Sequence, residues 1–260
     1  AYQDSILICP PTYGMYAISA ENHGADIVKV PLQNTAQGMQ LDLDGLQSNV
    51  GKVKVVFLCS PGNPTGNLLS KEQIIAAIEL FKDSAIVVVD EAYIEFSPEQ
   101  TSTDLLAKYD NVIVLRTLSK AFALAGLRCG FTLANKDIIT LLSKVIAPYP
   151  ISAPVAEIAS KALTTDLDNM AQRVQSCNST KASLSTWLSE RSWCSEVFPS
   201  DANFVLFRCI NPQEKTRIFD TLVEKNILIR DQSKQMQLEN CLRISIGSEH
   251  EITQLKEVLS

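Results

Sequence analysis

Residues 85–90 read Ala-Ile-Val-Val-Val-Asp, an uninterrupted apolar run that ends on an acidic residue. A strand without polar alternation is buried on both faces, which is typical of a parallel sheet covered by helices. Similar runs recur along the first half of the chain and alternate with helical patterns. Further strands are predicted at Ser5–Cys9, Ala25–Val30, Val53–Leu58, Val112–Arg116 and Arg128–Leu133. The pattern predicts an α/β fold with a mostly parallel sheet sandwiched by helices.

Two segments between these strands contain local sequence motifs, one for the start of a helix and one for a loop. Ser70 is a good N-cap for a helix over Lys71–Lys82, and Gln73 has the spacing that completes a capping box. The segment Ser60–Gly66 is rich in Gly and Pro, so we expect a shaped loop directly after the strand at Val53–Leu58. In open α/β sheets, ligands bind at this carboxyl edge of the strands.

The second half of the chain predicts a different unit. A helix at Asp137–Val145 is followed by Ala147-Pro148-Tyr149-Pro150, which we interpret as a linker. Beyond it, helices are predicted at 153–163, 166–191, 213–225 and 249–259, with strands near 204–207 and 242–246. We therefore expect a large domain at residues 1–148 and a smaller α+β C-terminal domain at 149–260.

Composition excludes several classes of function. The chain has 260 residues, 46% of them hydrophobic, and its net charge of -6 without a basic stripe argues against nucleic-acid binding. No apolar stretch reaches the ~18 residues of a membrane helix, so we expect no membrane partner. Seven cysteines without a C-x-x-C pair, and only His23 and His250, make a metal site improbable and indicate a reducing, cytoplasmic location.

Polar residues at the strand ends carry the candidate chemistry. Asp90 ends its apolar run, where an acid is commonly only a helix cap or a solvated strand end. Lys120 precedes an apolar stretch; an isolated lysine is usually a surface charge, but desolvation here would lower its pKa and favour the neutral amine that a Schiff base needs. Arg128 lies between Leu127 and Cys129, so we expect a buried guanidinium that requires an anion such as phosphate.

Together these residue types match the needs of pyridoxal 5′-phosphate. Its aldehyde needs a lysine amine, and its pyridine nitrogen needs a carboxylate that keeps it protonated. Its ring oxygen needs neutral donors, and its phosphate needs an arginine and hydroxyl groups. The order Asn, Asp-x-x-Tyr, Ser-Lys, Arg along the chain supplies each of these groups. We therefore predict pyridoxal 5′-phosphate as the cofactor.

These motifs resemble those of the fold-type I aminotransferases. The resemblance rests on Ser60–Gly66, Asp90-Glu91-Ala92-Tyr93, Ser119-Lys120 and Arg128. Within that superfamily the chain is similar nearly end to end to the histidinol-phosphate aminotransferase family, on segments 9–16, 90–96, 116–130 and 147–150. The family fold implied is a pyridoxal-phosphate-transferase large domain with a smaller C-terminal domain.

The resemblance implies a role for individual residues. Lys120 would bond covalently to the cofactor, Asp90 would pair with the pyridine nitrogen, and Asn63 and Tyr93 would donate to the ring oxygen. It also implies that Tyr16 stacks on the ring, that Thr117, Ser119 and Arg128 hold the cofactor phosphate, and that Arg230 and Arg243 bind the substrate anion.

Two of these residues, and one further residue that fits the family, have an alternative interpretation. Tyr16 could be a core aromatic that shares a helix face with Tyr13, and Arg243 could be a solvated arginine on an edge strand. Asn203 fits a family pattern, but a turn residue before a strand is an equal alternative.

The activity that the resemblance implies is transamination of L-histidinol phosphate with 2-oxoglutarate, giving imidazole-acetol phosphate and glutamate in histidine biosynthesis by a homodimer. One alternative is a lyase of the threonine-phosphate decarboxylase type, because both reactions need the same electron sink. A second alternative is an inactive fragment.

The family pattern begins with an arm and an amide-lined turn that precede the part matched here. We therefore expect an incomplete anion site, in which the cofactor is loosely held. We also expect the strand at Ser5–Cys9 to expose apolar surface, so that the 260-residue form is inactive and self-associates.

Overall fold

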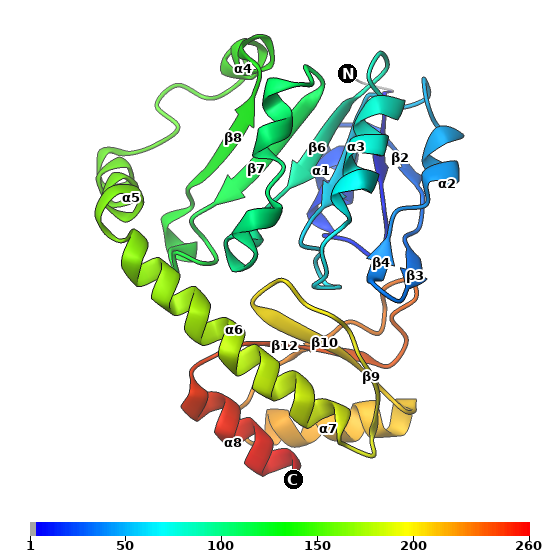
Figure 1. Cartoon of the computed structure of the whole chain (residues 1–260), viewed down its shortest axis with the longest axis vertical. Coiled ribbons are helices and arrows are strands. Elements are labelled where there is room, and N and C mark those ends of the chain that lie inside the picture. Colours follow the sequence, from blue (N-terminus) through cyan, green and yellow to red (C-terminus); the bar gives the residue numbers. More distant parts are fainter. Residues whose placement is uncertain (1–3) are drawn as a thin grey trace.

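The larger sheet of the protein has six strands in the order β2-β1-β5-β6-β7-β8. The structure is a computed structural model that describes residues 4–260. The strands are β1 (Ser5–Ile8), β2 (Asp26–Lys29), β5 (Val55–Cys59), β6 (Ile86–Asp90), β7 (Val112–Thr117) and β8 (Gly130–Ala134). Neighbouring strands run parallel except β8, which is antiparallel to β7. The predicted α/β class with a mostly parallel sheet is confirmed (Figure 1).

The centre of this sheet explains why its sequence is apolar. Val87 and Val89 of β6 are fully buried, and Val56 and Leu58 of β5 are too. Helix α3 (Lys71–Leu80) packs on β6 and contributes Ile74, Ala77 and Ile78 to the same core cluster. The remaining elements of the first half are α1 (Met15–Asn22), α2 (Leu43–Gln47), the β3–β4 hairpin (Gln33–Thr35 and Gly38–Gln40), and four short helices, η1 (Ile94–Phe96), η2 (Pro98–Gln100), η3 (Thr103–Ala107) and η4 (Ala125–Leu127).

Helix α3 begins as expected, but its capping box is only half formed. The Ser70 hydroxyl accepts a hydrogen bond from the Gln73 amide at 3.2 Å. The Gln73 side chain, however, accepts from the backbone amide of Leu41 at 3.0 Å instead of returning to Ser70. The tertiary contact with the residue after β4 takes the place of the local one, because it satisfies another buried donor.

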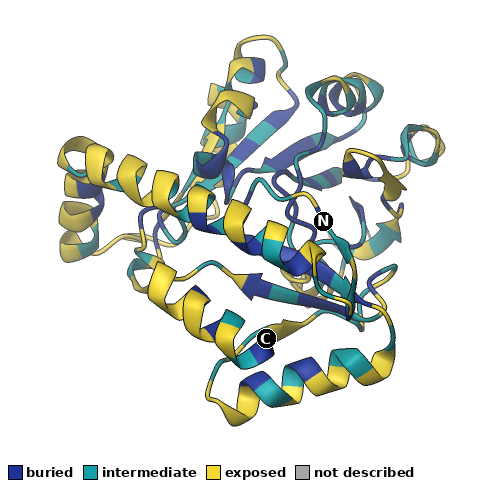
Figure 2. Ribbon diagram, turned by 60° about the horizontal axis from the view of Figure 1, so that its bottom comes forward, coloured by how far each residue is buried: buried dark blue, intermediate teal, exposed yellow. Residues whose placement is uncertain are grey.

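The expectation that Ser5–Cys9 exposes apolar surface is wrong. Strand β1 lies between β2 and β5, and Leu7, Ile8 and Cys9 are at most 5% exposed. The edge strands are β2 and β8, and Leu133 on β8 is 38% exposed. Figure 2 shows that buried residues concentrate in the strands and that the helices carry most of the exposed ones. Exposed apolar surface therefore lies at the β8 end of the sheet.

The second sheet has four antiparallel strands in the order β11-β12-β10-β9. These are β9 (Cys194–Val197), β10 (Phe204–Cys209), β11 (Arg230–Asp231) and β12 (Cys241–Ser245), and the helices of this half are α4 (Lys136–Ser143), α5 (Ala153–Thr165), α6 (Leu167–Ser189), α7 (Pro212–Glu224) and α8 (Glu249–Leu259). Helix α6 runs from the neighbourhood of the large sheet to the small one (Figure 1). The short strands β9 and β11 were not predicted from the sequence.

The two sheets share part of their core. Leu206 of β10 and Cys241 of β12 belong to the same buried cluster as the interior strands of the large sheet. The carboxyl edge of the large sheet consequently faces the small sheet (Figure 1). None of the helices in residues 4–260 is both long and apolar enough to cross a membrane.

Candidate active site

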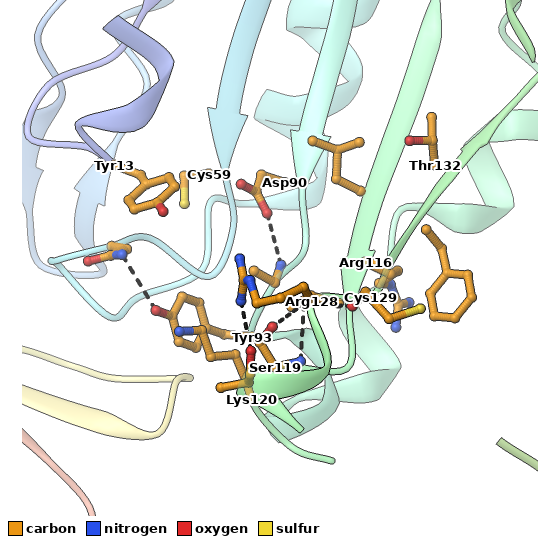
Figure 3. A pocket seen from close by; sticks show the side chains of 17 residues that line it. Tyr13, Cys59, Asp90, Tyr93, Arg116, Ser119, Lys120, Arg128, Cys129 and Thr132 are labelled. Carbon is orange, nitrogen blue, oxygen red and sulfur yellow. Dashed lines mark hydrogen bonds between the residues drawn. The ribbon is translucent and has the colours of Figure 1, made fainter. Parts of the chain in front are cut away.

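A cavity of about 480 Å³ lies at the carboxyl edge of the large sheet (Figure 3). Its lining comes from the ends of β5, β6 and β7, from the segment between β7 and β8, and from β8 itself. Seven of the residues predicted from the sequence lie in this lining: Asn63, Asp90, Tyr93, Thr117, Ser119, Lys120 and Arg128. The fold therefore brings together side chains that are up to 65 positions apart in the chain (128 minus 63).

Asp90 is the last residue of β6 and its carboxylate has two donors. The Ala92 amide donates to Oδ1 at 3.1 Å, and the Tyr16 hydroxyl donates to Oδ2 at 2.6 Å. Burial raises the pKa of Asp90, whereas both hydrogen bonds and the charge of Lys120 favour the ionised form. A protonated ring nitrogen placed against this carboxylate would add a further stabilising charge.

Lys120 follows β7 and is half-buried. Its Nζ lies 5.2 Å from the centre of the Tyr93 ring. Burial, followed by the charges of Arg243 and Arg128, lowers the pKa of Lys120, and Asp90 opposes the shift. The predicted lowering by apolar surroundings is therefore confirmed in direction, and the amine is easier to deprotonate than that of a surface lysine.

Asn63 and Tyr93 form a pair of neutral donors beside Lys120. The Asn63 Nδ2 donates to the Tyr93 hydroxyl at 3.4 Å. The oxygen of the same amide accepts from Nη1 of Arg243 at 2.6 Å, which leaves its nitrogen as the donor toward the cavity side. Burial raises the pKa of Tyr93 to about 12, so the phenol keeps its proton at neutral pH.

Thr117, Ser119 and Arg128 supply groups that suit an anion. The Thr117 hydroxyl donates to the Ser119 hydroxyl at 2.8 Å and accepts from the Ser119 amide at 3.1 Å. The expectation of a buried Arg128 is wrong: the residue is exposed, with a left-handed backbone at φ 55°, and its Nη1 donates to the Ala125 carbonyl. Its apolar sequence neighbours do not cover it: Cys129 belongs to a buried cluster against which Leu127 packs, whereas Arg128 is exposed.

Tyr16 does not lie in the cavity lining. It is 6% exposed, its ring stacks on Phe57 with centres 4.7 Å apart, and its hydroxyl is the donor to Asp90. Tyr13, which sequence reasoning considered only as its helix neighbour, does line the cavity and is 43% exposed. The stacking role of Tyr16 therefore stays a prediction, and Tyr13 is an additional aromatic candidate.

The two predicted substrate arginines lie on neighbouring strands of the small sheet. Arg243 is on β12, an interior strand, so the alternative of a solvated edge arginine is wrong. Its guanidinium lies over Phe204 at 4.6 Å, and its Nε is buried without a hydrogen-bond partner among residues 4–260. Arg230 is its register partner on β11 and is exposed. Asn203 contributes a backbone contact, accepting from the Ile246 amide at 2.9 Å.

An ion network that joins the end of β7, shortly before Lys120, to the segment after β6 was not predicted from the sequence. Arg116, at the end of β7, donates to Glu91 at 2.8 Å and to Glu95 at 3.0 Å. Glu91 is 1% exposed and also accepts from Thr101 and from the Ser102 amide. The only available signal was a second acid next to Asp90, which by itself does not identify a buried partner.

The residues present fit pyridoxal 5′-phosphate. One cavity holds an amine, a carboxylate, an amide with a phenol, and two hydroxyls with a guanidinium, which correspond to the aldehyde, pyridine nitrogen, ring oxygen and phosphate. Its volume lies within the ~300–1,000 Å³ that is usual for small-molecule sites. Within residues 4–260, His, Cys, Asp and Glu side chains form no group of three that could hold a metal ion.

Comparison with known sequences finds a matching family model and similar proteins that are named as aminotransferases. The family model described as aminotransferase class I and II matches residues 2–260. The histidinol-phosphate aminotransferase of Colwellia psychrerythraea is 72% identical over 265 residues, which cover 100% of this chain and 72% of that protein. The enzyme of the same name from Yersinia enterocolitica is 50% identical over 250 residues, which cover 96% of this chain and 65% of that protein. The chain thus spans about two thirds of the length of the second relative.

Solved structures of aminotransferases and related enzymes have the same fold. The histidinol-phosphate aminotransferase of Sinorhizobium meliloti, solved in complex with pyridoxal 5′-phosphate, has a TM-score of 0.87 and 27% identity, covering 99% of this chain and 70% of that one. A threonine-phosphate decarboxylase from Porphyromonas gingivalis has a TM-score of 0.81 at 22% identity, covering 99% and 76%, and shows the fold alone. Because the family model spans nearly the whole chain and a relative is 72% identical over all of it, this protein belongs to the class I and II aminotransferases, within the histidinol-phosphate aminotransferase group.

Proposed function

We propose that this protein transfers the amino group of L-histidinol phosphate to 2-oxoglutarate with pyridoxal 5′-phosphate as its cofactor, producing imidazole-acetol phosphate and glutamate in histidine biosynthesis. The observation that carries the proposal is the convergence of Lys120, Asp90, Asn63 and Tyr93 on one cavity. Amino transfer needs a basic amine, an electron-withdrawing ring and fixed donors around it. The names of the relatives support the choice of substrate.

In this proposal Lys120 handles the proton that is transferred. Its lowered pKa makes a neutral Nζ available both for covalent attachment of the cofactor and, once the substrate amine has displaced it, for removing the proton from the substrate α-carbon. Pyridoxal phosphate, when bound, supplies the electron-poor ring that stabilises the negative charge left on that carbon. The Lys120 Nζ would then deliver the same proton to the cofactor carbon, so that one residue would act as base and then as acid.

The other residues would hold the cofactor in place. The Asp90 carboxylate would pair with the ring nitrogen and keep it protonated, while Asn63 and the Tyr93 phenol, whose raised pKa keeps it neutral, would donate to the ring oxygen. Thr117, Ser119 and Arg128, which line the cavity, would hold the phosphate. Tyr16 remains a proposed ring-stacking residue.

Arg243 and Arg230 are proposed to bind the anionic part of the substrate. Arg243 reaches the cavity edge, since it donates to Asn63, and its buried Nε has unused donor capacity within residues 4–260. Arg230 is paired with it in register on β11. Two guanidinium groups at adjacent positions suit a phosphate with its two negative charges.

We also infer that residues 1–148 form the cofactor-binding domain and 149–260 the small domain, and that the enzyme acts as a homodimer in the cytoplasm. The two separate sheets support the division. Free cysteines throughout the described chain are consistent with a reducing compartment.

The experiment compares two reactions of the purified chain loaded with pyridoxal 5′-phosphate. Glutamate formation from histidinol phosphate and 2-oxoglutarate is measured beside carbon dioxide release from threonine phosphate. Where the chain holds the cofactor, we expect glutamate formation only, and the sequence-based expectation of an inactive 260-residue form would then be wrong. Lys120→Ala should lower it by at least ~10²-fold while leaving the thermal unfolding temperature nearly unchanged.

Lys215→Ala is the matched control, because Lys215 is also partly buried but pairs with Asp231 on the small sheet. It should retain the wild-type rate. Carbon dioxide release without glutamate would favour the decarboxylase alternative. Absence of both reactions, together with absence of a cofactor absorption band, would favour the inactive fragment.

A further inference from the structure

The loop 199–203, which connects β9 and β10, lies against the turn that carries Asn63. The amide of Asp201 donates to the Gly66 carbonyl at 2.8 Å. Its carboxylate accepts from the Leu68 amide at 3.1 Å through Oδ2, and from the Ser97 hydroxyl at 3.4 Å through Oδ1. One side chain from the β9–β10 loop thus joins two segments that follow strands β5 and β6 of the large sheet.

Each of these segments carries one of the two neutral donors of the site. Leu68 follows the turn with Asn63, and Ser97 directly follows η1, which begins after Tyr93. The side chains of Asn63 and Tyr93 meet in a hydrogen bond of 3.4 Å. The carboxylate of Asp201 therefore links, through hydrogen bonds, the two backbone segments that carry Asn63 and Tyr93.

The contact between loop and turn is close-packed. Thr65 and Asn67 are 1% and 3% exposed. A Cβ atom at Gly66 would lie 2.8 Å from the Ser200 hydroxyl, so the turn and the loop meet without space between them. Displacing one of them would displace the other, because closely packed groups transmit small shifts.

We propose that Asp201 is a positioning residue that sets Asn63 relative to Tyr93, so that both donors reach the same oxygen of the cofactor. It acts through the backbone of the two segments and is not among the cavity-lining residues found in 4–260. The inference rests on the proposed cofactor roles of Asn63 and Tyr93. Its structural part, the holding of the turn by Asp201, can be measured without cofactor or substrate.

The test compares Asp201→Ala with Asp201→Asn in the full chain. Alanine removes both side-chain contacts. Asparagine keeps them, because its oxygen can accept from the Leu68 amide while its nitrogen donates to the Ser97 hydroxyl. Asp220→Ala is the control, since Asp220 is an exposed carboxylate on α7.

The first readout is amide hydrogen exchange of the peptide covering 60–69, measured by mass spectrometry on the protein without cofactor. We expect exchange to be at least several-fold faster in Asp201→Ala, and close to wild type in Asp201→Asn and in the control. Pyridoxal 5′-phosphate titration, followed by its absorption band, is the second readout. If Asn63 and Tyr93 no longer reach the cofactor oxygen together, two neutral hydrogen bonds to it are weakened. The apparent affinity for pyridoxal 5′-phosphate should then fall about tenfold, in the alanine variant only.

Unchanged exchange in Asp201→Ala would overturn the proposal, and so would an asparagine variant as impaired as the alanine variant. Faster exchange with unaltered cofactor affinity would also overturn it, because the turn would then be held for stability alone. A wild-type chain that binds no pyridoxal phosphate would instead contradict the proposed function, and the exchange result would still decide whether Asp201 holds the turn.

Discussion

Asp90 combines partial burial with a proposed catalytic role. Its pKa is raised by burial, and the Tyr16 and Ala92 hydrogen bonds counteract that shift. A carboxylate largely removed from water is stable in its ionised form only with donors and an opposite charge nearby. The protonated ring nitrogen would be that charge, so the side chain and the cofactor would stabilise each other.

We expect Asp90→Asn to keep the cofactor but to lose most activity. The amide has the same shape but does not maintain the proton on the ring nitrogen. Because the interaction matters most when negative charge develops on the substrate carbon, kcat should fall more than KM changes. Steady-state kinetics and the absorbance of the bound cofactor are the measurements. A proportional loss of cofactor occupancy would mean that Asp90 is mainly an anchor.

The charge environment of Lys120 predicts a pH effect with a definite sign. Burial, and after it the charges of Arg243 and Arg128, lower the pKa of Lys120, so removing either positive charge should raise that pKa part of the way back. In the protein without cofactor, Arg243→Gln should therefore shift the pH at which Lys120 reacts with an acylating reagent to higher values. Peptide mass spectrometry across a pH series measures this shift.

The control for this effect is Arg173→Gln. Arg173 is an exposed arginine that pairs with Asp166 on α6, so its loss should leave the Lys120 profile unchanged. A shift to lower pH in Arg243→Gln, or equal shifts in both variants, would contradict the assigned electrostatic cause.

At the scale of elements, the turn from Ser60 to Asn67 depends on one backbone conformation. Gly66 has φ +89°, a conformation that side chains other than glycine rarely adopt, and it closes the turn through the Gly66 amide to the Gly62 carbonyl at 2.9 Å. Asn63 lies in this turn, so the conformation of the turn sets the position of Asn63. The conformation of Gly66 therefore affects both the stability of the protein and the position of Asn63.

Gly66→Ala should destabilise the protein by roughly 1–2 kcal/mol from the backbone conformation alone, with the contact to Ser200 adding to it. Urea unfolding measures the change. Gly14→Ala is the matched control, because Gly14 has φ -62° and open space around its Cβ position. Equal stability of the two variants would show that the left-handed conformation at Gly66 is not required.

At the scale of the whole molecule, exposed apolar side chains gather on one part of the chain. Leu133 of β8 is followed by Leu141 and Val145, which are 62% and 81% exposed, and by Ile146 at 60%. Strand β8 is also a sheet edge, and no charged residue lies within Gly130–Ala134. Uncharged edges with apolar neighbours favour association with another chain.

We expect the 260-residue protein to self-associate through this surface, and the paired change Leu141→Lys with Val145→Lys to reduce it. Light scattering over a range of protein concentrations measures the mass. Leu228→Lys is the control, because Leu228 is 83% exposed but lies between α7 and β11. A monodisperse monomer in the wild type, or an equal effect of the control, would contradict this surface as the cause.

Local patterns in the sequence were sufficient for the elements that carry their own signals. The strands at β5, β6 and β7 were predicted because buried parallel strands are continuously apolar, and α8 was predicted with the bounds 249–259 that it has. The capping box at Ser248 and Glu251 begins that helix through contacts three residues apart. The order of Asn63, Asp90, Lys120 and Arg128 was likewise sufficient to predict the cofactor, because each chemical group needs a specific residue type.

Only the tertiary structure decided which partner each side chain has. The Gln73 side chain accepts from the Leu41 amide and not from Ser70, Arg128 is exposed, and β9 and β11 exist as strands only because β10 and β12 lie beside them. Arg243 reaches Asn63 across 180 positions of the chain. Such contacts form between surfaces that the whole fold brings together, and their energies depend on burial and on neighbouring charges. A linear pattern records neither of these, so it predicts the residue types of the site but not their arrangement.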